Sequence, residues 1–173
     1  MIGPLTTIAT DDGVELQVGE VDPSTHGALL HREFNGILAA GEGYPHAGPI
    51  SYAEFSDYWL KDKSAVVGAW ARHDGSFVGS YFLKPNGPGR AAHVGNAGYF
   101  VVPEWRGQGV GEALVVESME RARSLGFDAL QFNFVFETNP ARSLYERLGF
   151  RMVGRVPDVI DGEAVCIYWR PLT

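Results

Sequence analysis

The sequence has little that would suit an extracellular or membrane-bound protein. Its one cysteine, Cys166, cannot form an internal disulfide, so no oxidising compartment is indicated and we expect the cytoplasm. No apolar run approaches the ~18 residues of a membrane span. No Lys or Arg precedes Arg32, so the start lacks the positive region of a signal peptide.

Motifs of several common chemistries are missing as well. The five histidines are accompanied by neither HExxH nor CxxC, so we expect no metal site. No G-x-S-x-G elbow and no Gly-Lys-Ser/Thr loop occurs. Basic residues are few: 14 Lys and Arg against 21 Asp and Glu give a net charge of −7. An acidic body repels phosphate backbones and anionic surfaces, so we expect neither nucleic acid nor a membrane as partner.

The apolar content is sufficient for one core. A chain of 173 residues with 45% hydrophobic residues suits a single domain over 1–173, since a second core would need about 50 to 100 residues more. The 22 glycines and 10 prolines stay below the ~25–30% that marks low-complexity chains. A folded domain is therefore expected.

Hydrophobic periodicity predicts a mixture of strands and helices. Strands are expected at 14–21, 64–71, 77–83, 93–102, 129–136, 152–156 and 164–170, the first paired with 5–10. Helices are expected from a Ser24 cap to Gly41, from Tyr52 to Leu60 behind a Ser51/Glu54 capping box, from Arg106 to Leu125 and from Pro140 to Gly149. Hairpins and one strand-helix-strand crossover predict an α+β fold, with a mainly antiparallel mixed sheet that contains one parallel strand pair and is flanked by helices.

A glycine-rich segment, Pro103–Gly111, lies between a predicted strand and a predicted helix. Each glycine in a first helical turn weakens the helix by about 1 kcal/mol relative to Ala, so Gly107, Gly109 and Gly111 need a reason. Without Cβ atoms an anion can approach unpaired backbone N–H groups, and Arg106 adds a cation. The segment therefore either binds a diphosphate or forms a tight turn packed on the sheet.

The second informative segment is the last predicted helix. Ala141, Leu144, Tyr145 and Leu148 share one face, which is typical of a core tyrosine whose hydroxyl still needs a partner. A phenol with a reference pKa near 10 is also matched to protonate a thiolate whose conjugate acid has a pKa near 8.5. The second interpretation requires a bound thiol cofactor.

Together the two segments resemble the GNAT superfamily of acyl-CoA-dependent N-acyltransferases. Arg106–Gly111 (R-x-x-G-x-G) matches that family's pyrophosphate loop, and Leu144–Phe150 (L-Y-x-x-x-G-F) matches its last-helix motif. The resemblance runs from His93 to Tyr168 and implies acetyl-CoA as cosubstrate, in a cleft where strands 93–102 and 129–136 splay apart. It implies Tyr145 as general acid and contacts to the cofactor from Phe100, Val101, Arg106, Gly107, Gln108, Gly109, Val110, Gly111, Asn139 and Ser143.

Two positions depart from the family pattern. Thr138 stands where the family often has Asn, with Asn139 one place later, and Asn133 stands where many members have a catalytic Glu. An amide cannot accept a proton as a base. The loop Tyr44–His46 resembles the family's acceptor-site loop, which makes His46 a minor candidate for substrate contact.

Asn96 and Asn133 lie in predicted strands, where Asn is depleted and a buried unpaired amide costs about 1–3 kcal/mol. Either both are satisfied within the sheet, or their NH2 groups bind a substrate carboxylate or carbonyl. The segments His93–Gly98 and Phe132–Phe136 resemble the branch that contains the yeast proline-analogue (azetidine-2-carboxylate) acetyltransferase, which acts on small cyclic amino acids. Alternation predicts Phe132, Phe134 and Phe136 on one face of the strand and Gln131, Asn133 and Val135 on the other.

We therefore expect an acetyl-CoA-dependent N-acetyltransferase that acts on the amine of a small amino-acid-like molecule by direct transfer in a ternary complex. The alternatives are acetylation of protein N-termini, lysine, polyamines or aminoglycosides, and a CoA-binding module without turnover. Trp59, Trp70 and Trp105 are expected at the surface, where they leave room for a homodimer interface.

Overall fold

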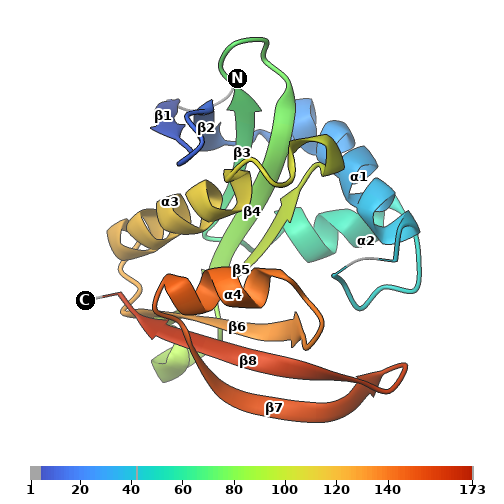
Figure 1. The fold of residues 1–173 in the computed structure, drawn as a ribbon, viewed down its shortest axis with the longest axis vertical. Helices are drawn as coiled ribbons and strands as arrows, with labels where there is room; N and C mark the ends of the chain where they lie inside the picture. The colour runs from blue at the N-terminus through green and yellow to red at the C-terminus, as the bar shows by residue number, and fades with distance from the viewer. Residues whose placement is uncertain (1–4, 42, 173) are drawn as a thin grey trace. The chain divides into compact units, whose positions relative to one another are not determined.

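The computed structural model describes residues 5–41 and 43–172, which form two compact units. The first unit contains the residues up to Leu83 together with Gly98–Ser118. The second unit contains Lys84–Ala97 and the residues from Met119 onward. Three elements contribute residues to both units: strand β4 (Phe77–Pro85), strand β5 (Val94–Val101) and helix α3 (Val110–Ser124) (Figure 1). The expectation of one domain stays a prediction.

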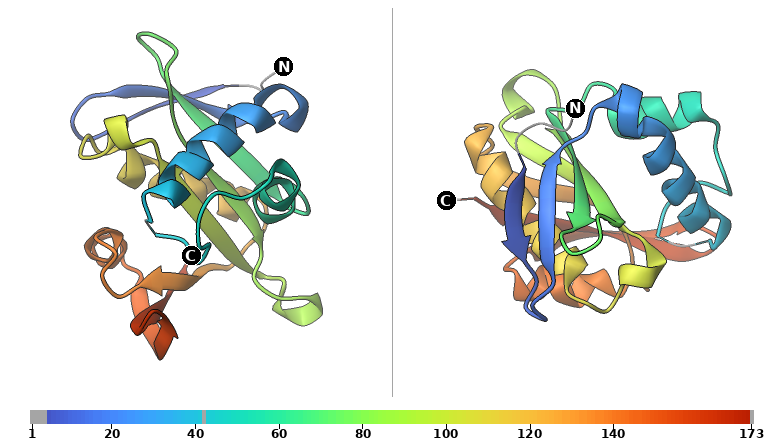
Figure 2. Two further views of the ribbon diagram at one scale, coloured as in Figure 1. Left: turned by 90° about the vertical axis from the view of Figure 1, so that its right-hand side faces the viewer. Right: turned by 90° about the horizontal axis from the view of Figure 1, so that it is seen from above.

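The first unit is an antiparallel meander with helices on one face. Its strands β1 (Thr6–Ala9), β2 (Glu15–Glu20), β3 (Ala65–Ala71) and β4 (Phe77–Pro85) pair consecutively, which confirms both predicted hairpins. Helices α1 (Pro23–Ala39) and α2 (Tyr52–Phe55) lie over the same face of these strands (Figure 2). Helix α2 begins with the predicted capping box and continues as one π-helical segment, η1 (Ser56–Leu60).

An aromatic cluster forms the core of the first unit. Phe34, Phe55, Trp59, Phe82 and Phe100 are all buried and pack ring against ring between the helices and the strands. Trp59 is fully buried, so its expected surface position is wrong, whereas Trp70 and Trp105 are half-buried. The physical reason is that Trp59 lies on the inner side of η1. Burying its large apolar ring stabilises the fold by more than hydration of its single N–H group would.

Two predicted helix starts are wrong. Asp22 caps α1, because its carboxylate accepts the Ser24 N–H at 2.9 Å and Pro23 occupies the first helical position. Helix α3 begins at Val110 rather than Arg106, since Gly107 (φ +71°) and Gly109 (φ +76°) have left-handed backbone conformations that no right-handed helix contains.

The second unit holds the parallel strand pair. Strand β6 (Ala129–Phe136) runs parallel to β5, with Val94 opposite Ala129 and Gly95 opposite Leu130. β8 (Glu163–Pro171) pairs antiparallel with β6, and β7 (Arg151–Ile160) pairs antiparallel with β8. Helix α4 (Ala141–Arg147) packs on this sheet through Tyr145. The predicted fold class, a mainly antiparallel mixed sheet with one parallel pair and flanking helices, is confirmed.

The predicted alternation along β6 fails at its centre. The register with β8 shifts between Phe132 and Val135, so the strand contains a bulge. At the bulge Phe134 is 38% exposed, whereas Val135 and Phe136 are both buried, at 4% and 8%, so the alternation is interrupted. In the described ranges no helix is both long and apolar enough to span a membrane.

Candidate active site

The glycine-rich loop joins the end of β5 to α3 within the first unit. A 3-10 turn, η3 (Pro103–Trp105), is followed by Arg106–Gly109, whose two left-handed glycines reverse the chain into the helix. The amides at the start of an α-helix have no acceptor within the helix, and the helix dipole favours negative charge beside them. The loop therefore leads into a helix N-terminus that offers backbone donors, and its binding of a diphosphate stays a prediction.

Two of the loop glycines are explained differently by the structure. A Cβ on Gly109 would lie 3.0 Å from the Thr10 Cβ, so this glycine is required by its φ angle and by packing. A Cβ on Gly111 would meet only Val101 Cγ2, at an ordinary 3.8 Å, and its φ is not left-handed. The fold therefore does not require a glycine at position 111, which fits a site where an anion approaches the backbone closely.

The other predicted cofactor residues of the first unit surround this loop. The exposed Arg106 side chain donates through Nε to the Val101 carbonyl oxygen at 3.4 Å, and Gln108 Nε2 donates to Glu104 O at 3.1 Å. Val110, at the helix start, is 1% exposed and so can contribute only its backbone. Phe100 is buried in the aromatic cluster, which leaves its backbone as the contact that the resemblance implies.

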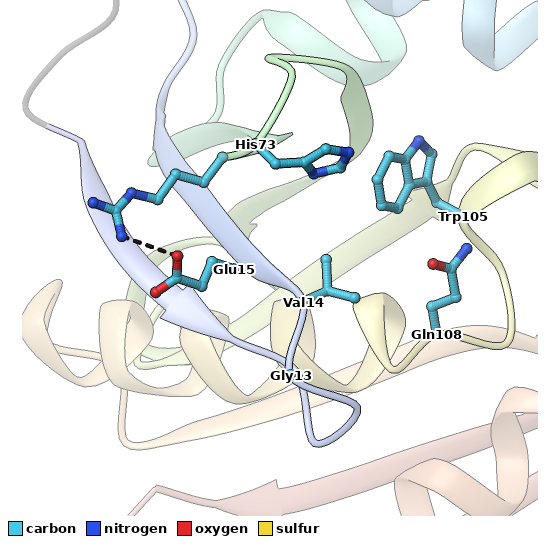
Figure 3. Close-up of a pocket in the computed structure, with 7 residues that line it drawn as sticks. Gly13, Val14, Glu15, His73, Trp105 and Gln108 are labelled. Atoms are coloured by element: carbon cyan, nitrogen blue, oxygen red, sulfur yellow. Dashed lines mark hydrogen bonds and ion pairs between the residues drawn. The ribbon is translucent and has the colours of Figure 1, made fainter.

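A hollow of about 600 Å³ lies beside the loop (Figure 3). It is lined by Gly13, Val14, Glu15, Arg72, His73, Trp105 and Gln108, all from the first unit. Arg72 and Glu15 form an ion pair at 2.9 Å on one side, and the rings of His73 and Trp105 lie next to each other, tilted by 55°, with centroids 5.9 Å apart. Of the predicted site residues only Gln108 lines it, so no sequence pattern indicated this hollow.

Tyr145 is held in the second unit by aromatic packing. Its ring lies against Phe132 at a centroid distance of 4.8 Å and against Phe150 at 6.0 Å, and 9% of the residue is exposed. Burial raises the pKa of Tyr145 to about 12, because the phenolate would be desolvated. Within the described residues its hydroxyl has no hydrogen-bond partner, although the oxygen is not sealed from solvent. Water can satisfy a hydroxyl that it reaches, so the role of Tyr145 as general acid stays a prediction.

A second tyrosine nearby was missed by sequence reasoning. The Tyr168 hydroxyl accepts from Arg142 Nε at 2.9 Å and donates to Glu146 Oε1 at 2.8 Å. Both partners lie on α4, one turn apart, and the Tyr168 ring lies 5.9 Å from that of Tyr145. The only hint in the sequence was that Arg142 and Glu146 are four residues apart, which places them on the same face of the last helix. This network fixes α4, and with it Tyr145, on the sheet.

The predicted residues at the start of α4 make local bonds. Asn139 Oδ1 accepts the Ala141 N–H at 2.9 Å, and Ser143 Oγ donates to Pro140 O at 3.1 Å. The Asn139 amide nitrogen is left for other contacts. Ser143 is exposed. Their cofactor roles stay predictions.

The two strand asparagines differ in environment. Asn96 is 9% exposed, and its Nδ2 donates to the Gln131 carbonyl oxygen at 2.9 Å, directly after the parallel pairing of β5 and β6. The Asn96 side chain thus donates to β6 at the point where the backbone hydrogen bonds between β5 and β6 end. Asn133 is exposed, and its Nδ2 donates to Asn86 Oδ1 at 2.5 Å. Each amide therefore already uses at least one N–H within the protein.

His46, the minor candidate, lies beside the aromatic cluster of the first unit. Its ring contacts Tyr58 at a centroid distance of 4.7 Å, and burial lowers its pKa.

Among the described residues, no group of three or more His, Cys, Asp and Glu side chains is placed to hold a metal ion.

Comparison with known proteins now identifies the family. The model of the acetyltransferase (GNAT) family matches residues 30–150, so this chain belongs to the GNAT family. Acetyl-CoA is the cosubstrate of GNAT acetyltransferases.

Three relatives illustrate the similarity. A GCN5-related N-acetyltransferase from Kribbella flavida superposes with a TM-score of 0.82 at 32% identity, over 90% of this chain and 97% of that one. N-acetyltransferase aca1 of Schizosaccharomyces pombe is 39% identical over 84 residues, which are 48% of this chain and 40% of aca1. L-amino acid N-acetyltransferase AaaT of Escherichia coli is 27% identical over 64% of this chain and 70% of its own length. The chain thus spans less than half of the length of aca1.

Proposed function

We propose that this protein transfers the acetyl group of acetyl-CoA to the amine of a small amino-acid-like acceptor, by direct transfer in a ternary complex. The observation that carries the proposal is the glycine-rich segment that leads into α3, because Gly111 in the first turn of the helix has no structural reason to be glycine. The amino-acid acceptor is supported by the name of AaaT and by the uncharged Asn133 at the position where many GNAT members carry Glu. Assignment to the proline-analogue branch stays a prediction.

The residues of each unit have separate roles in this proposal. Acetyl-CoA, when bound, supplies a thioester with an activated carbonyl. Backbone N–H groups from Gly107 to Gly111 bind its pyrophosphate, with Arg106 as counter-charge, and a backbone N–H of β5 stabilises the oxyanion. Tyr145 donates its hydroxyl proton to the sulfur.

The atoms balance without a further co-reactant. The neutral amine nitrogen bonds to the acetyl carbon, and the bond from that carbon to sulfur breaks. Sulfur leaves with the electron pair and receives the Tyr145 proton. The extra proton of the new amide nitrogen leaves through water, because Asn133 cannot act as a base. Tyr145 regains a proton from solvent.

The acceptor class is tested by thiol release from acetyl-CoA. We expect the wild-type protein to acetylate small amino acids with a higher kcat/KM than their amides or esters, and kcat/KM to rise with pH toward the pKa of the amine. Preference for polyamines or aminoglycosides over every amino acid would contradict the proposed acceptor. CoA binding without thiol release from any amine would indicate a binding module.

The cofactor site is tested by Gly111→Val. Branched bulk in the first turn of α3 blocks close approach of an anion, and hydrogen bonds to charged groups contribute about 1.5–3 kcal/mol each. We expect the Kd for CoA, measured by calorimetry, to rise about tenfold or more.

Gly36→Val is the matched control, since Gly36 is an exposed helical glycine of α1 with no atom near its Cβ position. Both variants lose a similar amount of helix stability, but only Gly111→Val should lose affinity. Equal CoA affinity in the two folded variants would contradict the pyrophosphate role of the loop.

A further inference from the structure

Three side-chain amides of the second unit form one hydrogen-bonded chain. Gln131 Nε2 donates to Asn133 Oδ1 at 2.7 Å, and Asn133 Nδ2 donates to Asn86 Oδ1 at 2.5 Å. Gln131 and Asn133 are two residues apart on β6, whereas Asn86 directly follows β4. Asn86 is itself anchored, because its backbone N–H donates to Val94 O at 2.8 Å.

The chain of amides has a direction. Each amide has one acceptor oxygen and two N–H donors, so these two bonds use one N–H of Gln131 and one of Asn133 but neither N–H of Asn86. Here the acceptor end is Gln131 Oε1 and the donor end is Asn86 Nδ2. Within the described part of the chain, neither of these two atoms is hydrogen-bonded to another residue.

The donor end suits an anion. Asn86 is half-buried, and the bond that its oxygen accepts from Asn133 polarises the amide and strengthens its N–H donors. A carboxylate accepts such bonds with the added strength of its charge, whereas an ammonium group offers donors only. Asn96, by contrast, is 9% exposed and already donates to the Gln131 backbone.

We propose that Asn86 is a specificity-determining residue whose NH2 group binds the carboxylate of the acceptor, while Asn133 and Gln131 orient and polarise it. This assignment rests on the proposed function, since it presupposes an amino-acid acceptor. It moves the main carboxylate contact from Asn96 and Asn133 to a residue that no sequence motif indicated. Asn133 then acts mainly as a positioning residue.

The test is Asn86→Asp, assayed with pairs of amino acids and their amides. The new carboxylate can still accept the Asn133 N–H, so the bonded chain is retained, but the donors are lost and a negative charge faces the acceptor. We expect KM for amino acids to rise about tenfold or more, KM for the amides to change less than about threefold, and CoA affinity to be unchanged. Asn86→Ala removes the donors without adding charge. It should raise the KM for amino acids by a smaller factor, again more than it raises the KM for their amides.

Gln17→Glu is the charge control, because it adds one negative charge on β2 of the first unit at a residue without a proposed role. It should leave both KM values unchanged. If the wild type acetylates amino acids but Asn86→Asp and Asn86→Ala raise KM equally for acids and amides, the assignment of Asn86 is overturned and the proposed function stands. If the wild type acetylates no amino acid, the proposed function fails and this assignment fails with it.

Discussion

Tyr145→Phe should lower kcat by about 100-fold or more, the usual contribution of a positioned general acid. Phenylalanine keeps the ring that packs on Phe132 and Phe150 but removes the only proton that this side chain can donate. Because the hydroxyl has no partner in the described structure, its removal breaks no internal hydrogen bond. Activity should therefore fall while the thermal midpoint changes by only a few degrees.

The comparison variant is Tyr52→Phe, which removes a hydroxyl from an exposed tyrosine of α2 and should leave kcat unchanged. Pre-steady-state measurements establish whether acetyl transfer limits kcat. If transfer is rate-limiting and Tyr145→Phe lowers kcat less than threefold, Tyr145 is a core tyrosine only.

The pH profile gives a second readout for Tyr145. An ordinary tyrosine loses half of its protons near pH 10, but burial raises the pKa of Tyr145 to about 12. The acid form is the active form, so its population persists above pH 10 and declines only as pH approaches 12. We expect no loss of kcat from this group between pH 8 and 10.

Trp59→Ala should lower the free energy of unfolding by about 3–5 kcal/mol, the range for deletion of a buried large aromatic ring. Trp59 is fully buried, with its ring centroid 4.9 Å from that of Phe82 and 5.0 Å from that of Phe100, and it donates through Nε1 to Ser80 Oγ at 3.1 Å. The substitution leaves a cavity at the centre of the aromatic cluster. Urea denaturation followed by circular dichroism measures the loss.

Trp105→Ala provides the contrast, since Trp105 is half-buried at the edge of the hollow shown in Figure 3. Its loss should cost roughly 1 kcal/mol or less, as for most substitutions away from a core. The Ser80 hydroxyl keeps its bond to Val67 O at 2.7 Å in both variants. Equal losses for the two tryptophans would contradict the central role of Trp59 in the first unit.

Features that depend on neighbouring residues were predictable from the sequence. The capping box of Ser51 and Glu54 involves groups three residues apart, and the hairpin turns are encoded by Asp12-Gly13 and Asp74-Gly75. The glycine loop and Tyr145 were singled out as candidates because their spacing follows a family motif. Asp22 was missed as a cap because Ser24 also fits the pattern, although Pro23 at the first helical position favoured Asp22.

The sequence by itself therefore determined the order of elements, the fold class and the GNAT motifs, because these depend on short-range periodicity, turn chemistry and spacing. Tertiary structure alone decided the bulge that exposes Phe134, the burial of Trp59 and the bond from Asn133 to Asn86, which lie 47 positions apart. Pairing with β8 sets the bulge, and ring packing sets the position of Trp59. The amide chain exists only because folding brings the end of β4 to the side chains of β6, and no local pattern encodes a contact between residues that distant in sequence.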